Sequence, residues 1–190
     1  MDYPAAVSRF VKTAIPYTRV MQPTVAWSKG EKRMLDGCDM IVSLYHLPKM
    51  PDAGNVKIKR AFVGDKDKIL GFIEKHFHRG WVHEAEHAMM QEVSKCFVAT
   101  ENGQIIGFAA FDGAAKGFFG PIGVEETHRK SNVGAALLIC TLNAMREYGY
   151  AYAVIGWVGD AEPFYRKTVG AEKIKGGNPE NSVYSNMVSL

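Results

Sequence analysis

Apolar residues recur at strand-like or helix-like spacing from residue 56 to residue 124, which predicts a regular series of short elements. The Asn102-Gly103 pair between two apolar runs is typical of a tight β-hairpin turn. Asp65 is expected to cap the first helix. The predicted elements are a strand at 56–62, helices at 65–77 and 83–93, and strands at 96–100, 104–111 and 118–124.

The second half of the chain contains the strongest helical pattern. Between Asn132 and Tyr148, apolar residues form one stripe at helical spacing, and Gly149 follows as a C-cap. A mostly apolar run at 150–158 then predicts a buried strand. The remaining expected elements are a short helix at 161–168 and strands at 171–174 and 183–188. This order predicts an α/β fold with a mixed central sheet flanked by helices.

Residues 1–54 differ from the rest, because five of the eight prolines fall there and interrupt any long apolar period. Residues 7–14 have helical spacing, and residues 40–45 fit a strand. We therefore expect an N-terminal arm over 1–54, either packed on the domain or used in dimerisation, and a single domain over 55–190. The pattern is compatible with a homodimer.

The composition, with 47% hydrophobic and 23% charged residues among 190, is that of an ordinary globular domain. The net charge of +3 is too small to indicate a nucleic-acid partner. Three cysteines without paired spacing favour reduced thiols, and therefore a cytoplasmic protein. The chain contains no run of 18 apolar residues, so we expect no membrane partner.

The segment just before the long helix has the composition of an anion site. A helix N-terminus presents unpaired N–H groups and the positive end of the helix dipole. Arg129 and Lys130 add positive charge there. Ser131 or Asn132 can cap the helix, and Gly134 leaves room for close approach. The segment is a candidate phosphate cradle, although a solvated basic turn has the same composition.

The predicted strand before this turn contains Gly120, Pro121 and Gly123, which weaken its pairing with a neighbouring strand. Its unpaired backbone groups are suited to a ligand with peptide-like amides. An irregular edge strand is the simpler alternative. A phosphate cradle beside such a strand points to a long ligand with a pyrophosphate and amides, and coenzyme A has both.

The run from Arg129 to Leu138 resembles the acetyl-CoA signature of the Gcn5-related N-acetyltransferase (GNAT) superfamily, in which Arg/Gln-x-x-Gly-x-Gly/Ala opens a helix. The run departs from that signature at Asn132, where the family usually has glycine, but asparagine tolerates a left-handed backbone better than most residues. The run from Ala161 to Ala171 resembles a late element of the same family, Ala-x-x-Phe-Tyr-x-x-x-Gly-Phe.

The resemblance covers residues 56–175 and implies a GNAT-like acyl-CoA N-acyltransferase fold, splayed between the strands at 118–124 and 150–158. It implies direct transfer of an acetyl group from acetyl-CoA to a primary amine. Tyr165 matches the tyrosine that protonates the leaving CoA thiolate, a role that suits a phenol. The residues implied in cofactor binding are Ile122, Gly123, Val124, Arg129, Lys130, Ser131, Asn132, Val133, Gly134 and Ala135.

The acceptor side is less well defined by the sequence. The strand at 118–124 carries no Glu to act as general base, so Glu84, Asp112 or a chain of waters is expected to take the proton of the amine. Trp81 is either a wall of the acceptor site or a core residue. The acidic and aromatic residues before Met89 fit a small-molecule acceptor of the amine, amino-sugar or amino-acid type.

Two other functions compete with this interpretation. His83-Glu-Ala-Glu-His87 fits the zinc-hydrolase motif His-Glu-x-x-His, in which two histidines bind the metal and the Glu activates water. The charge around this motif and the lack of a suitably placed third ligand favour a protein without a metal. Asn132 and the missing strand Glu also suit a non-catalytic module that binds acyl-CoA.

Overall fold

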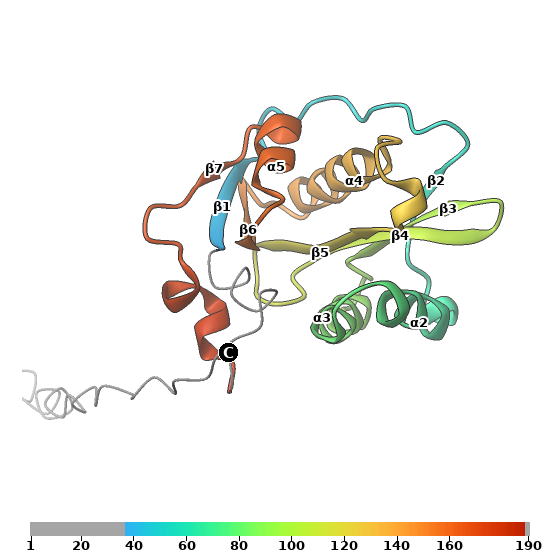
Figure 1. The fold of residues 1–190 in the computed structure, drawn as a ribbon, viewed down its shortest axis with the longest axis horizontal. Helices are drawn as coiled ribbons and strands as arrows, with labels where there is room; N and C mark the ends of the chain where they lie inside the picture. Colours follow the sequence, from blue (N-terminus) through green and yellow to red (C-terminus); the bar gives the residue numbers. More distant parts are fainter. Residues whose placement is uncertain (1–36, 189–190) are drawn as a thin grey trace, which may run out of the picture.

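The computed structural model describes residues 37–188, which form a mixed sheet with helices on both faces (Figure 1). The strands are β1 (Cys38–Ser43), β2 (Lys57–Arg60), β3 (Cys96–Glu101), β4 (Gln104–Phe111), β5 (Phe118–Val124), β6 (Tyr152–Val158) and β7 (Glu172–Lys173). The α-helices are α2 (Lys66–His76), α3 (Arg79–Met89), α4 (Val133–Glu147) and α5 (Glu162–Val169). The 3-10 helices are η1 (Val63–Asp65), η2 (Glu126–His128), η3 (Pro179–Asn181) and η4 (Val183–Asn186).

The sheet contains a fork between its two central strands. Its order is β2-β3-β4-β5-β6-β1-β7, and the β5–β6 pair is parallel, whereas the other pairs are antiparallel. The β5–β6 pairing consists of Phe118 with Val154 and Phe119 with Ile155. Beyond these two pairs the strands separate, as the resemblance implied. We call the space between residues 120–124 of β5 and residues 156–158 of β6 the fork.

The helices cover the sheet in two layers, each with its own apolar core. Figure 1 shows α2 and α3 on one face and α4 and α5 on the other. Leu137, Leu138 and Leu142 of α4 are completely buried against one face. Ile69 and Ile73 of α2 are buried against the other. The predicted α/β architecture is therefore observed.

The predicted arm contributes a strand to the sheet itself. Met40 and Val42 of β1 are buried in the same apolar core as the α4 side chains, and β1 pairs with both β6 and β7. The sheet therefore begins before residue 55. The strand in the proline-rich segment joins the central sheet because it pairs with strands that lie far along the chain. The helical pattern at 7–14 lies outside the described residues.

Two predicted elements differ from the structure in position or type. Helix α3 begins at Arg79 rather than residue 83, because the His78 ring caps it by accepting a hydrogen bond from the Gly80 N–H at 3.1 Å. The tail predicted as a strand at 183–188 instead contains η4, with local bonds such as Met187 N–H to the Tyr184 carbonyl. The predicted hairpin turn is confirmed by positive φ angles at Asn102 (49°) and Gly103 (79°).

None of the helices in residues 37–188 combines the length and hydropathy that crossing a bilayer requires.

The position of β1 predicts that alanine substitutions of two adjacent residues change the free energy of unfolding by very different amounts. Met40 is completely buried, whereas Ile41 is 37% exposed on the other face. We expect Met40→Ala to lower the free energy of unfolding by about 2–5 kcal/mol, because it leaves a cavity in the core. Ile41→Ala is the matched control and should cost less than about 1 kcal/mol. Equal small effects in urea titrations would show that β1 is not part of the cooperative core.

Candidate active site

A cavity of about 450 Å³ passes through the sheet at the fork. Its lining comes from α3 on one face, from α5 on the other, and from both strands of the fork. A closed sheet would separate these two helices. The fork therefore lets side chains from opposite faces, such as Glu84 of α3 and Tyr165 of α5, line one space.

Glu84 is a carboxylic acid placed to titrate near neutral pH. Burial raises its pKa to about 7. No side chain or backbone group in residues 37–188 forms a hydrogen bond or ion pair with its carboxylate. A carboxyl group that is desolvated and unpaired in this way has the property of a general base at neutral pH.

Trp81 packs in the core and also lines the cavity. Its position therefore fits both of the predicted alternatives, a core residue and a wall of the acceptor site. Its ring is stacked on Phe77, with centroids 5.5 Å apart, and lies edge-on to Phe108 at 6.2 Å. The same residue lines the cavity beside Glu84.

Tyr165 lies on the α5 side of the cavity. It is 7% exposed, and burial raises the pKa of its phenol above the ordinary value. Its ring is held between Phe164 at 5.1 Å and Phe119 at 6.3 Å. The phenol is therefore protonated at neutral pH and is available as a proton donor.

The C-terminal segment adds a wall that the sequence patterns did not reveal. Tyr184 and Met187 line the cavity, and the Tyr184 ring packs on Trp157 of β6 at 5.2 Å. The buried Asp39 carboxylate holds this arrangement by accepting hydrogen bonds from the Trp157 N–H and the Ser182 hydroxyl, both at 2.8 Å. The tail was predicted as a strand, and no spacing in the sequence connects it to α3.

The turn before α4 has the geometry of the predicted anion cradle. Asn132, the N-cap of α4, has a left-handed backbone with φ of 63°, and Lys130 has φ of 70°. Asparagine thus occupies the conformation that glycine would otherwise supply. The first helical hydrogen bond runs from the Ala136 N–H to the Asn132 carbonyl at 2.9 Å. The N–H groups of residues 133–135 precede it and are available to an anion.

Side chains of the turn are oriented by local hydrogen bonds. Arg129 Nε donates to the Val124 carbonyl at 3.3 Å, which holds the guanidinium stem beside the end of β5. The Ser131 hydroxyl donates to the His128 carbonyl. Asn132 Nδ2 donates to the Asp52 carbonyl at 3.1 Å, so the loop between β1 and β2 crosses close to the cradle, as Figure 1 also shows.

The two glycines assigned to cofactor binding have different surroundings. A Cβ on Gly134 would lie 3.7 Å from the Phe164 and Val124 side chains, so the position faces the space between α4, α5 and β5. A Cβ on Gly123 would lie 2.5 Å from the Phe77 ring. Gly123 is therefore needed for packing on the α2 face, whatever its backbone contributes to a ligand.

The backbone of β5 presents alternate residues to the fork. The N–H of Glu125, the residue that follows β5, donates to the Ile106 carbonyl. The polar backbone groups of Glu125 therefore point toward β4. Backbone direction alternates along an antiparallel pair. The N–H and C=O groups of Ile122 and Val124 therefore point away from β4, toward the open edge of the fork.

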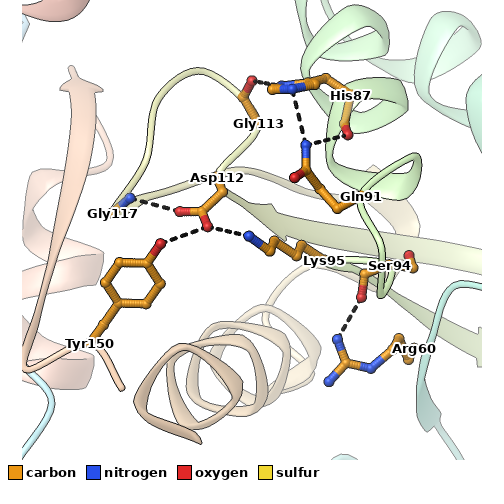
Figure 2. Close-up of polar contacts among 9 residues, drawn as sticks. All are labelled: Arg60, His87, Gln91, Ser94, Lys95, Asp112, Gly113, Gly117 and Tyr150. Carbon is orange, nitrogen blue, oxygen red and sulfur yellow. Dashed lines mark hydrogen bonds and ion pairs between the residues drawn. The ribbon is translucent and has the colours of Figure 1, made fainter. Parts of the chain in front are cut away.

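Asp112 does not belong with Glu84 and Trp81 in this site. Its buried carboxylate accepts hydrogen bonds from Lys95 Nζ at 2.6 Å, the Tyr150 hydroxyl at 2.8 Å and the Gly117 N–H at 2.7 Å (Figure 2). It is not among the residues that line the cavity. Asp112 therefore stabilises the connection between β4 and β5 and lies outside the candidate site.

Among the residues that the structure describes, the two histidines of the zinc-type motif are not grouped with a third metal-ligating side chain. His87 Nδ1 donates to the Gly113 carbonyl at 2.7 Å, and its Nε2 accepts from Gln91 at 3.0 Å (Figure 2). Both ring nitrogens are therefore engaged. Across the described part of the chain, no three His, Cys, Asp or Glu side chains are grouped to hold a metal ion.

Comparison with known proteins links this geometry to one family. Residues 92–168 match the family described as Acetyltransferase (GNAT) domain. A similar fold occurs in the GCN5-related glucosamine N-acetyltransferase region of a fungal multi-domain beta-N-acetylglucosaminidase, with 15% identity and a TM-score of 0.59 over 73% of this chain and 20% of that chain. A GCN5-related N-acetyltransferase from Sphaerobacter thermophilus gives 17% identity and a TM-score of 0.58 over 72% of this chain and 48% of that chain.

A third similar structure is a GCN5-related N-acetyltransferase from Kribbella flavida, with 16% identity and a TM-score of 0.51 over 72% of this chain and 54% of that chain. This chain therefore covers about half or less of each of these structures. A search of curated proteins finds no match. At these identities the likeness establishes the fold.

The network around Asp112 predicts a loss of stability when its charge is removed. We expect Asp112→Asn to lower the free energy of unfolding by about 3–5 kcal/mol, because the Lys95 ammonium, 16% exposed, would lose its buried partner. Tyr150→Phe removes one hydroxyl that donates to the same carboxylate, and it should lower the free energy of unfolding by only about 1 kcal/mol. Chemical denaturation measures both values, and an unchanged Asp112→Asn midpoint would contradict the structural role.

Proposed function

Because residues 92–168 match the Acetyltransferase (GNAT) domain family, we propose that the chain is a GCN5-related N-acetyltransferase that transfers the acetyl group of acetyl-CoA to a primary amine at the fork. The observation that carries this proposal is that the fork brings a carboxyl group with a pKa of about 7 and a protonated phenol to one cavity from opposite faces of the sheet. Direct transfer needs such a pair, because the amine must lose a proton and the thiolate must gain one.

The cofactor is proposed to lie along β5 and the turn before α4. The backbone groups of Ile122 and Val124 would pair with the amides of the pantetheine arm, in the manner of an added strand. The N–H groups from Lys130 to Ala135 would hold the pyrophosphate, with Lys130 adding charge. The Arg129 N–H already donates to the Glu126 carbonyl at 3.2 Å. The acetyl thioester would then reach the fork, where a backbone N–H of β5 can stabilise the developing oxyanion.

The proposed reaction has three steps carried by this chain's own residues. Glu84 in its carboxylate form accepts a proton from the ammonium of the acceptor. The neutral amine then attacks the thioester carbonyl, forming a carbon–nitrogen bond and a tetrahedral intermediate. When the carbon–sulfur bond breaks, the nitrogen loses its second proton to solvent and the neutral amide forms. Tyr165 gives its proton to the CoA thiolate and regains one from the protonated Glu84.

The cradle can be tested by calorimetric titration with acetyl-CoA. We expect the double variant Arg129→Ala and Gly134→Asp to weaken one-site binding at least about 100-fold, because it removes one positive charge and places a carboxylate at the helix N-terminus. Gly71→Asp is the charge control, because that α2 glycine has no neighbour within 4 Å of an added Cβ. Unchanged binding by the double variant would rule out this cradle.

The base can be tested through the pH profile of kcat/KM. Since Glu84 acts as a carboxylate, the rate should rise as pH increases through about 7 and then level off. We expect Glu84→Gln to lower kcat about 10²–10⁴-fold and to abolish this limb. Tyr165→Phe is the contrast, because it should lower kcat but retain the limb. A limb that persists in Glu84→Gln would assign the base to another group.

A further inference from the structure

The part of the cavity on the α3 side is rich in aromatic side chains. Its walls include the rings of Trp81, Trp157 and Tyr184 and the thioether of Met187. Glu84 and Asp160 are its acidic residues, and within residues 37–188 no Lys or Arg lines it. The described lining also contains no Ser, Thr, Asn or Gln side chain.

This lining discriminates between kinds of amine. An ammonium group is attracted by aromatic faces and by a nearby carboxylate. A carboxylate or phosphate elsewhere on the acceptor would lack the Arg or Lys that normally pairs with it. The hydroxyl groups of a sugar would need several polar partners. The polar side chains of the described lining are two carboxylates, two tyrosine hydroxyls, two indole N–H groups and the His78 ring, whose Nδ1 already accepts from the Gly80 N–H.

From this we infer that the acceptor is a primary amine on an apolar aryl or alkyl chain, without a carboxylate and without a sugar ring. The inference rests on the proposed function and narrows its acceptor. The aryl or alkyl group would lie among the rings of Trp81, Trp157 and Tyr184. The amine nitrogen would lie toward Glu84 and form its bond to the acetyl carbon as described above.

The aromatic wall is held in a fixed position, which supports its use in selection. A Cβ on Gly156 would lie 2.7 Å from Tyr184 Cε2, so the ring packs directly on the β6 backbone at the fork. Trp157 has a left-handed φ of 50°, a conformation that a bulky residue rarely adopts. The Asp39 carboxylate fixes both sides of this wall through the Trp157 N–H and the Ser182 hydroxyl.

The experiment compares four primary amines, of which phenethylamine and phenylalanine share a skeleton and differ only by a carboxylate. Release of free CoA thiol is measured with acetyl-CoA and phenethylamine, phenylalanine, hexylamine or glucosamine. We expect kcat/KM for phenethylamine to exceed that for phenylalanine and for glucosamine by at least about 100-fold, because the polar groups of the latter two would be buried without partners.

Two variants add readouts that separate the wall from the chemistry. Tyr184→Ala should raise the KM for phenethylamine about tenfold and leave the KM for acetyl-CoA unchanged. Tyr152→Ala, which removes a tyrosine that is 53% exposed and outside the cavity, is the matched control and should change neither. Met187→Arg, at a position 53% exposed, should raise kcat/KM for phenylalanine relative to phenethylamine by supplying a partner for the carboxylate.

The outcomes distinguish this inference from the proposed function. If phenylalanine or glucosamine is acetylated as efficiently as phenethylamine, the acceptor class is wrong while amine acetylation stands. If no amine is acetylated by protein that is folded and supplied with acetyl-CoA, both the acceptor class and the proposed function are overturned. A preference for phenethylamine and hexylamine that Tyr184→Ala weakens supports the inference.

Discussion

The separation of β5 from β6 after two residue pairs is the constraint on which the rest of the site depends. A fully paired sheet is a barrier, because its backbone groups are mutually satisfied and its side chains project to one face or the other. In this protein the pairing of β5 with β6 stops after two residue pairs, which leaves an opening in the sheet. An acid from α3 and a phenol from α5 consequently line the same cavity, and the freed edge of β5 offers backbone groups to a ligand.

Three carboxyl groups in the structure show how surroundings assign a role to the same chemical group. Asp39 and Asp112 are each buried and hydrogen bonded to several donors, which fixes the backbone around them. Glu84 has no such donor in the described residues, and burial alone raises its pKa. A satisfied carboxylate stabilises a fold, whereas an unsatisfied one beside a cavity is suited to accepting protons.

The parts of the structure that depend on local physics could be predicted from the sequence. Periodicity located α4 and β5, the Asn102-Gly103 pair located a hairpin, and Asn132 adopts the left-handed backbone that its place in the signature requires. These features follow from residues close together in the chain.

The parts that depend on long-range contacts could not be predicted in the same way. The sequence predicts an arm at the position of β1, because the partners of this strand, β6 and β7, lie far along the chain. Asp112 has the right charge for the site, but its three donors come from three separate connecting segments of the chain. Tyr184 lines the cavity from a tail that a hydrogen bond from Ser182 joins to Asp39, and no spacing rule connects those positions.

The place of β1 in the sheet also sets the order in which the molecule can be built. Ile41 pairs with Val154, and Met40 pairs with Lys173, so β1 fits between two strands that are synthesised long after it. Since a chain leaves the ribosome from its N-terminal end, this strand is exposed while the central strands emerge. Its apolar side chains can be buried against β6 and β7 only after both strands have been synthesised, so until then β1 is an unpaired strand edge exposed to aggregation.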